Sequence, residues 1–493
     1  VSKFQTDGIE SQHNRPHPPP SERRGDTIGD QAEMEEAGSA GQTRRLGRRL
    51  LLFSLPFQGH INPMFQLATL LFQRGFSVTV IHTLFNAPDP SGHPHFRFVA
   101  IDDGLPEEVL NSHDILAKAI AITEACRAPF RDCLVRLLEE AAREGEDPVA
   151  CLLADAMLYS IAGVAEELGV RRVAVRTSSA AYMRMFSVFP TLWGKGYYPI
   201  QKQRREEEVP EAPPYRVKDL MNFEHSSDAS LLEIITNGME SIRDSAALVL
   251  NTFEDLEAAD VAVLRRALPS PVFTVGPLHK FSQNASNSLL EQDRSCMAWL
   301  DRHPAGSVIY VSFGSLADME KEELAEVAWG LAGSGQPFLW VVRLGSVRGE
   351  GAVELPAGFA EETQGRGMVV AWAPQVEVLA HPAVGAFWTH CGWNSIVESL
   401  CEGVPMLCRP CFGDQTGNAR YVSHVWKVGL VLEDALQRGQ VERAVRTLLV
   451  EEEGAELRER ARSMKEKAGS CIKEGGSSYG CLDNLVDFIL SAP

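Results

Sequence analysis

Length, composition and charge set the first limits on this chain. It has 493 residues, of which 44% are hydrophobic, and a formal net charge of -19. That length suffices for two domains with cores of their own, and the composition is globular. The negative charge would repel phosphate backbones and anionic lipid, so it excludes nucleic acid and membrane surfaces as natural partners. The sequence holds no apolar run long enough to span a bilayer, and we expect no membrane insertion.

Cysteine usage indicates the redox compartment. The 10 cysteines lack the dense spacing of a disulfide-stapled secreted domain, which predicts free thiols and a cytoplasmic location. Cys408 and Cys411 have C-x-x-C spacing, but no second pair lies nearby to complete a zinc site. We therefore expect no metal there. Separately, we expect the protein to be a monomer.

The first 46 residues differ from the rest. They are rich in Pro, Ser, Gly, Arg and Glu and have almost no apolar periodicity, which predicts a disordered extension over 1–46. The first residue is Val1 and the first methionine is Met34. Our hypothesis is that residues 1–33 are a translated leader or a cloning remnant that folding and activity do not need.

Buried strands and amphipathic helices alternate from Arg49 onward. The pattern predicts a strand at 50–55, a helix at 63–74 and a strand at 76–81, which together form a βαβ unit. Further strands are predicted at 149–154, 172–176 and 247–251. A second series of the same kind follows, with strands predicted at 307–313, 337–342, 367–371 and 384–387.

These two series predict an α/β protein with two doubly wound sheets. Linker composition separates them, so we place one Rossmann-like domain at 47–281, a linker at 282–292 and a second Rossmann-like domain at 293–470. The segment 471–493 is expected to be helical and to pack back on the first domain. Ligands of open parallel sheets bind beyond the carboxyl ends of the strands, so the residues after each strand are the ones to search for a site.

The turn after the strand at 384–387 has the features of a phosphate site. Gly392 permits a tight backbone, and Asn394 and Ser395 supply hydrogen-bonding side chains. The helix that follows presents unpaired N–H groups and the positive end of its dipole. His390 adds either a hydrogen-bond donor or a positive charge.

Polar and aromatic residues on either side of that turn suit a nucleotide sugar. Trp372 can lie against a planar base, Gln375 can read its edge, and Glu398 can accept from ribose hydroxyls. Asp414 and Gln415 offer partners to sugar hydroxyls. Each residue alone has a structural alternative, since tryptophans commonly pack and a single histidine or glutamate is commonly structural. Their order within one short segment favours a binding site.

The segment 372–415 resembles the signature of plant family-1 UDP-glycosyltransferases. It has the family's Trp, His-Cys-Gly-Trp-Asn-Ser, Glu and terminal Asp-Gln elements, and the resemblance extends from Arg49 to the C-terminus. It implies the GT-B fold, with a UDP-sugar site in the second domain and an acceptor site mainly in the first. It also implies these donor-binding residues: Trp372, Ala373, Gln375 and Glu398 for the nucleoside, Ser315, His390, Asn394 and Ser395 for the diphosphate, and Trp393, Asp414 and Gln415 for the sugar.

The first domain supplies a base. The motif Gln58-Gly-His-Ile-Asn-Pro63 follows the first strand and resembles the family's catalytic histidine loop. A histidine side chain titrates close enough to neutral pH for His60 to accept a proton from a hydroxyl group. Asp155 resembles the family's partner aspartate, which would orient the imidazole. Thr177 is a weaker candidate for a sugar contact, and capping of a helix is the alternative.

The resemblance implies transfer of glucose from UDP-glucose to a hydroxyl of a small hydrophobic plant metabolite, with inversion. No Asp-x-Asp pair occurs, so we expect metal-independent transfer without a cofactor. A Rossmann oxidoreductase is disfavoured because no G-x-G-x-x-G follows a strand, and a UDP-sugar binding protein without turnover is disfavoured by His60 and Asp155.

The acceptor itself stays open. General resemblance is to the branch with grass benzoxazinoid glucosyltransferases, while flavonoids, phenolics, hormones and terpenoids remain alternatives. We predict an acceptor pocket of apolar side chains, with ordinary core as the alternative. Its expected members are Phe85, Met157, Tyr182, Met183, Met185 and Phe186.

Overall fold

The computed structural model describes residues 45–110, 112, 114–223, 226–282, 288–349, 353–433 and 435–491. The predicted disorder of 1–46 and the leader hypothesis for 1–33 therefore fall almost entirely outside the described residues. So do residues 283–287 of the predicted linker.

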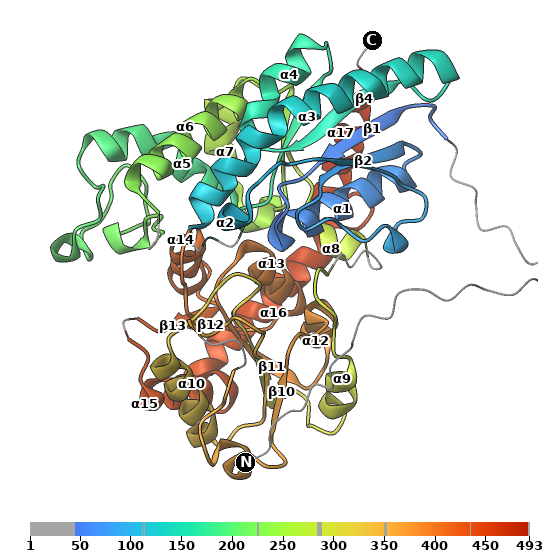
Figure 1. Ribbon diagram of the computed structural model, residues 1–493. Helices are drawn as coiled ribbons and strands as arrows, with labels where there is room; N and C mark the ends of the chain where they lie inside the picture. The colour runs from blue at the N-terminus through green and yellow to red at the C-terminus, as the bar shows by residue number, and fades with distance from the viewer. Residues whose placement is uncertain are drawn as a thin grey trace, which may run out of the picture. The chain divides into compact units, whose positions relative to one another are not determined.

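The first sheet has seven parallel strands in the order β3-β2-β1-β4-β5-β6-β7 (Figure 1). Its strands are β1 (Arg49–Phe53), β2 (Ser77–Thr83), β3 (Arg97–Ile101), β4 (Val149–Asp155), β5 (Arg172–Arg176), β6 (Ala247–Leu250) and β7 (Val272–Thr274). Alternate residues of the central strand face opposite sides, as a pleated strand requires. Leu50 and Leu52 pack into the core under α1 (Gln58–Gln73) and α17 (Ser477–Leu490). Leu51 and Phe53 pack into the core on the other side.

The second sheet has six parallel strands in the order β10-β9-β8-β11-β12-β13. Its strands are β8 (Val308–Ser312), β9 (Phe338–Val341), β10 (Gly367–Val370), β11 (Val384–Thr389), β12 (Met406–Cys408) and β13 (Gly429–Val431). Ile309 and Val311 pack on one side, with residues of α10 (Lys321–Ser334) and α15 (Arg438–Leu449). The two sheets match the predicted doubly wound α/β class.

Helices cover both faces of each sheet. The remaining helices are α2 (Glu107–Leu110), α3 (Ile115–Glu144), α4 (Ala162–Glu167), α5 (Ala180–Gly194), α6 (Asp228–Arg243), α7 (Glu254–Ala267), α8 (Leu278–Phe281), α9 (Ser295–Leu300), α11 (Phe359–Glu362), α12 (Gln375–Ala380), α13 (Trp393–Glu402), α14 (Gln415–Arg420) and α16 (Ala455–Cys471). In the described part of the chain, no helix is both long and apolar enough to cross a bilayer. All 10 cysteines are free.

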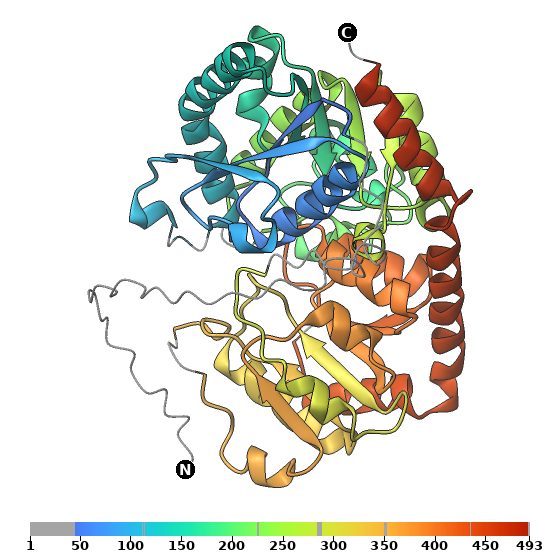
Figure 2. The ribbon, with the colours of Figure 1, turned by 90° about the vertical axis from the view of Figure 1, so that its right-hand side faces the viewer.

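The end of the chain returns to the first sheet. Helix α16 packs against α13, and α17 packs against β4 and β7. Figure 2 shows these two helices in red, one following the other along the side of both domains. Leu482, Leu485 and Ile489 of α17 are buried in the core that contains Leu50 of β1. The C-terminal helix is therefore part of the first domain's packing.

The first helix begins earlier than the sequence pattern predicts. We expected it to start at Pro63, but α1 starts at Gln58 and contains Pro63 within it. His60 is thus in the first turn of a helix, at the carboxyl end of β1, and is not in a loop. The backbone N–H of His60 donates to the carbonyl oxygen of Phe57 at 2.8 Å, which fixes this turn.

Candidate active site

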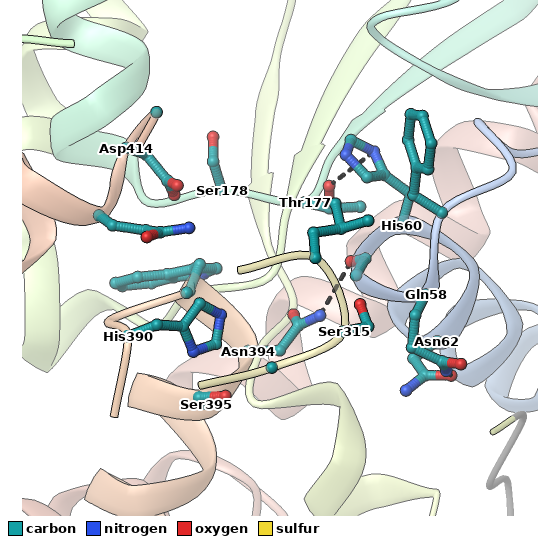
Figure 3. A pocket seen from close by; sticks show the side chains of 18 of the residues that line it. Gln58, His60, Asn62, Thr177, Ser178, Ser315, His390, Asn394, Ser395 and Asp414 are labelled. Atoms are coloured by element: carbon teal, nitrogen blue, oxygen red, sulfur yellow. Dashed lines mark hydrogen bonds between the residues drawn. The ribbon is translucent and has the colours of Figure 1, made fainter. Parts of the chain in front are cut away.

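One cavity of about 560 Å³ is lined by residues that follow strands of both sheets. Figure 3 shows His60 and Thr177 on one side of it and His390, Asn394 and Asp414 on another. The predicted residues that line it are His60, Met157, Thr177, Tyr182, Phe186, Ser315, Trp372, Ala373, Gln375, His390, Trp393, Asn394, Ser395, Glu398, Asp414 and Gln415. Segments far apart in the sequence therefore form a single site.

The predicted catalytic residues, a histidine and a buried aspartate, form a hydrogen-bonded pair. His60 Nδ1 lies 2.6 Å from Asp155 Oδ2 and 3.2 Å from Thr177 Oγ1. Asp155 is 1% exposed and sits behind His60, so it does not line the cavity. Because Nδ1 is occupied, Nε2 is the imidazole nitrogen left for a substrate. No described residue hydrogen-bonds to Nε2.

The environment of Asp155 keeps it charged. Burial by itself would raise the pKa of the Asp155 carboxyl, but the charge and hydrogen bond of His60 and the backbone N–H of Met157 together lower it. The Met157 N–H donates to Asp155 Oδ1 at 3.0 Å. An ionised Asp155 accepts the Nδ1–H of His60, which places the basic lone pair on Nε2. This is the arrangement that a general base requires.

Thr177 does not cap the next helix. Ser179 is the N-cap of α5, and its hydroxyl accepts from the Tyr182 N–H at 3.1 Å. The Thr177 hydroxyl instead contacts the His60 ring, so the capping alternative is wrong. Thr177 is left at the junction between the base and the cavity.

The phosphate turn between β11 and α13 has a different geometry from the one predicted at Gly392. The residue with positive φ is Cys391, at 67°, whereas Gly392 has an ordinary φ of -60°. Gly392 is required for another reason, because a Cβ there would lie 2.5 Å from His390 Nε2. A Cβ at Gly314 would lie 2.6 Å from the same atom. Two glycines thus make room for the His390 ring.

His390 acts as a neutral group. Burial lowers the pKa of His390 to about 4, the nearby Arg343 and Arg409 lower it further, and the hydrogen bond to the Ser312 backbone opposes them. In the cavity without ligand the His390 ring is therefore neutral at neutral pH, which favours the hydrogen-bond donor over the positive charge among the two predicted alternatives. Nδ1 of His390 is buried and has no hydrogen-bond partner among the described residues. A bound diphosphate would give that ring an anionic neighbour.

The start of α13 is open toward the cavity. Gly392, its N-cap, provides no side-chain cap for the first backbone N–H groups of the helix. Those groups and the helix dipole favour an anion at this position. Oδ1 of Asn394 is also buried without a partner among the described residues. Buried polar atoms without a partner are uncommon, and a bound ligand would account for two of them beside one cavity.

Glu398 and Gln375 form a buried pair. Gln375 Nε2 donates to Glu398 Oε2 at 2.8 Å and to Ser395 Oγ at 3.0 Å. Burial raises the pKa of Glu398 to about 7, and the hydrogen bond from Gln375 opposes the rise. The Gln375 side chain therefore positions Glu398, and its amide is not free to read a base edge as we predicted. The Trp372 indole N–H donates to Ser288 Oγ at 3.0 Å.

Asp414 and Gln415 open the helix α14. Asp414 accepts from Asn418 Nδ2 at 2.9 Å, and burial raises the pKa of its carboxyl although that hydrogen bond opposes the rise. Gln415 Oε1 accepts two backbone N–H groups, from Cys411 at 2.8 Å and from Phe412 at 3.1 Å. Only the Nε2 donor of Gln415 remains for a sugar, so the partner that this side chain can offer to a sugar hydroxyl is a donor.

Trp393 belongs to both the cavity and the domain boundary. Its indole N–H donates to the backbone oxygen of Asn251 at 2.9 Å. The side chain is 3% exposed and packs beside Trp426. Trp393 therefore joins the two domains next to the place where the sugar would lie.

Three of the predicted acceptor residues are not in the cavity lining. Met183 and Met185 are buried in the core, because α5 turns only the face bearing Tyr182 and Phe186 toward the cavity. Phe85 packs edge-on to Phe57 at 6.5 Å. The described lining residues that sequence reasoning missed include Phe57, Leu116, Arg176, Met221, Ile234 and Phe412.

Two parallel α/β domains that share a cavity with a carboxylate-oriented histidine and an anion-accepting helix end define a glycosyltransferase of the GT-B class. The family model described as "UDP-glucoronosyl and UDP-glucosyl transferase" matches residues 145–457. The chain belongs to this family of UDP-glycosyltransferases.

Curated relatives from plants match almost the whole chain. It is 45% identical to UDP-glycosyltransferase 76B1 of Arabidopsis thaliana, over 91% of this chain and 100% of that protein. It is also 45% identical to the DIMBOA UDP-glucosyltransferase BX8 of Zea mays, over 90% of this chain and 99% of that protein.

Solved structures share the fold and hold UDP or UDP-2fluoro-glucose. Os79 from O. sativa in complex with UDP has a TM-score of 0.74 and 27% identity, covering 89% of this chain and 100% of that one. Phytolacca americana UGT2 complexed with UDP-2fluoro-glucose and pterostilbene has a TM-score of 0.76 and 28% identity, covering 89% and 98%.

Proposed function

We propose that this protein transfers glucose from UDP-glucose to a hydroxyl group of a small hydrophobic metabolite, in one displacement that inverts the anomeric carbon. The observation that carries the proposal is the position of His60. Its Nε2 has no hydrogen-bond partner among the described residues, its Nδ1 is bound to Asp155 at 2.6 Å, and the start of α13 lines the same cavity. A base and an anion site in one cavity are what displacement of a diphosphate requires.

His60 acts on the acceptor. It accepts the hydroxyl proton on Nε2 as the hydroxyl oxygen bonds to the anomeric carbon, and the bond from that carbon to the diphosphate oxygen breaks. Asp155 stabilises the imidazolium that forms. Attack opposite to the leaving diphosphate gives a β-glucoside from an α-linked donor.

The second domain holds the donor. The N–H groups at the start of α13, with Ser315, Asn394 and Ser395, stabilise the diphosphate as it leaves, and His390 contributes a neutral ring. Glu398 accepts from the ribose, and Trp372 lies against the base. Asp414 and Gln415 contact the sugar. This set of groups needs no cation, so we propose metal-independent transfer without a cofactor.

Relatives support a secondary-metabolite acceptor. The maize protein BX8 is named a DIMBOA UDP-glucosyltransferase, and the Arabidopsis protein UGT76E12 is named a flavonol 3-O-glucosyltransferase. Apolar side chains, among them Met157, Tyr182 and Phe186, line the cavity in which the acceptor would lie. We infer an apolar acceptor body with at least one hydroxyl group.

The test is an acceptor screen with UDP-glucose. Purified protein is incubated with UDP-glucose and a mixture of phenolic acceptors, and UDP release is measured together with the masses of the products. Release of UDP with a hexose added to an acceptor supports the proposal, and proton NMR of the anomeric signal then reports the configuration. A protein that binds UDP-glucose but releases no UDP with any acceptor would be a binding protein, which contradicts the proposal.

A further inference from the structure

A buried arginine lies in the acceptor part of the cavity. Arg176 is the last residue of β5, is 6% exposed, and lines the cavity beside Thr177. Its guanidinium carbon is 4.9 Å from the centre of the Phe186 ring and 5.8 Å from that of Tyr182. The charged group therefore lies against the aromatic residues that would hold an acceptor.

Most of the hydrogen-bonding capacity of Arg176 is unused. Its Nε donates to Ser178 Oγ at 3.0 Å, and Ser178 also lines the cavity. Its two terminal nitrogens have no hydrogen-bond partner in the described part of the chain, and no described carboxylate lies within ion-pair distance of them. Neither terminal nitrogen is fully buried, although both lack a partner among the described residues. A ligand in the cavity can therefore reach them.

Another buried arginine of the same domain shows the usual arrangement. Arg184 of α5 is 8% exposed, and its Nε donates to Asp260 Oδ1 at 2.6 Å. Burying a guanidinium without a carboxylate partner is unfavourable, so such groups are normally paired. Arg176 departs from that rule at a ligand cavity.

The nearby carboxylates are already bound to other groups. The charge of Arg176 helps to lower the pKa of Asp155 and opposes the rise that burial causes in the pKa of Asp414. Asp155 is bound by His60 and the Met157 N–H, and Asp414 is bound by Asn418. The terminal nitrogens of Arg176 therefore remain available to a ligand.

We propose that Arg176 selects acceptors that carry a carboxylate in addition to the hydroxyl that receives the sugar. This inference rests on the proposed glucosyl transfer. Thr177 follows Arg176 directly and contacts His60, so one compact acceptor can reach both the guanidinium and the base. The apolar body lies against Phe186, and the carboxylate takes the two terminal N–H groups in the bidentate geometry that guanidinium favours.

The carboxylate does not react. The acceptor hydroxyl oxygen forms the bond to the anomeric carbon, the bond from that carbon to the diphosphate breaks, and the proton moves to His60 Nε2. UDP leaves, and the product is a glucoside that keeps its free carboxylate. A glucose ester would be the product only if the carboxylate were at His60.

The experiment compares acceptors that differ in charge alone. kcat/KM is measured with UDP-glucose for 3- and 4-hydroxybenzoate and for the corresponding hydroxybenzamides. We expect the unmodified protein to prefer at least one acid over its amide by about tenfold or more, the range of a charge-assisted hydrogen bond. Arg176→Met should abolish the preference, and Arg176→Lys should keep part of it. Phe186→Leu is the matched control, which lowers both rates but leaves their ratio unchanged.

A second measurement does not depend on the variants or on turnover of the acid itself. Benzoate should compete with the acceptor in the unmodified protein, and benzamide should compete at least about tenfold more weakly. Equal inhibition by the two compounds, an unchanged acid-to-amide ratio in Arg176→Met, or an alkali-labile ester product would overturn the assignment. Absence of UDP release with every acceptor, acidic or neutral, would instead refute the proposed glucosyl transfer.

Discussion

Asn394 donates a hydrogen bond of 2.8 Å from its Nδ2 to the carbonyl oxygen of Gly59, the residue before His60. That carbonyl is free because the residue four positions later is Pro63, which has no N–H to complete the helical bond. The phosphate turn of the second domain is thereby tied to the helical turn that carries the base. This contact links the turn that we propose to hold the donor to the turn that carries His60.

Asp155→Asn should lower kcat by a smaller factor than removal of His60. The imidazole stays in the cavity, but the amide can present an N–H to Nδ1, which favours the wrong tautomer and no longer stabilises the imidazolium. Steady-state kinetics and UDP titration measure the two effects separately. We expect kcat to fall while the Kd of UDP is unchanged, and a change in UDP affinity with kcat intact would contradict the positioning role.

Glu398→Gln should make the protein's stability less dependent on pH. The pKa of Glu398 is raised to about 7 from an ordinary value of 4.5, so the folded state holds this proton more tightly than the unfolded state. The stability that this proton contributes is fully present below about pH 4.5, and it is lost as the pH rises toward about 7.

Thermal melting from pH 5 to pH 8 without ligand measures this effect. The difference in Tm, variant minus unmodified protein, should increase as the pH rises from 5 to 8. The unmodified protein loses stability as Glu398 ionises, whereas the variant has no carboxyl to ionise at this position. The same substitution at Glu456, whose side chain is 78% exposed, is the control and should show no such trend. A pH-independent difference for Glu398→Gln would refute the raised pKa.

Chelation should leave the activity unchanged. The diphosphate site that we propose consists of helix N–H groups and neutral side chains, so removal of divalent cations should take away no part of it. Protein dialysed against EDTA is assayed for UDP release and again after addition of magnesium. Loss of activity that magnesium restores would show that a cation shares the diphosphate.

Gln415→Glu tests the reading of the donor sugar. The carboxylate keeps an oxygen for the N–H groups of Cys411 and Phe412, while the Nε2 donor is lost. Loss of one hydrogen bond to a specific hydroxyl should lower kcat/KM for UDP-glucose by about tenfold or more. The fall in kcat/KM should be smaller with UDP-galactose, because the hydroxyl that we propose Gln415 contacts has a different orientation in galactose. Equal losses with the two sugars would mean that Gln415 only holds the loop.

The continuously apolar strands were predictable, whereas the partly exposed β3 (Arg97–Ile101) and the shortest strands were not. Strands such as Leu50–Phe53 within β1 are continuous buried runs that periodicity detects. The three-residue strands β7, β12 and β13 are too short to give a pattern, and their position depends on the neighbouring strands. The start of α1 was misplaced because Pro63 was taken as a first helical residue, whereas the helix tolerates it further in.

The site was predictable where chemistry follows the end of a strand. Asp155 directly follows the predicted strand at 149–154, His60 lies in the turn that follows the predicted strand at 50–55, and their side chains meet. The helix face of α5 was not resolved from the sequence, so Met183 and Met185 were grouped with Tyr182 and Phe186. Arg176 was missed because a charged residue at a strand end resembles a solvent-exposed one, and only the folded cavity shows that it is buried.

The most direct measurement is the single-turnover rate of glucose transfer by His60→Ala, with the Kd of UDP-glucose determined on the same sample. Only proton removal is lost in this variant, so the Kd should stay close to that of the unmodified protein while transfer slows by roughly 100- to 10,000-fold. Transfer at the unmodified rate would contradict the assignment of His60 as the base.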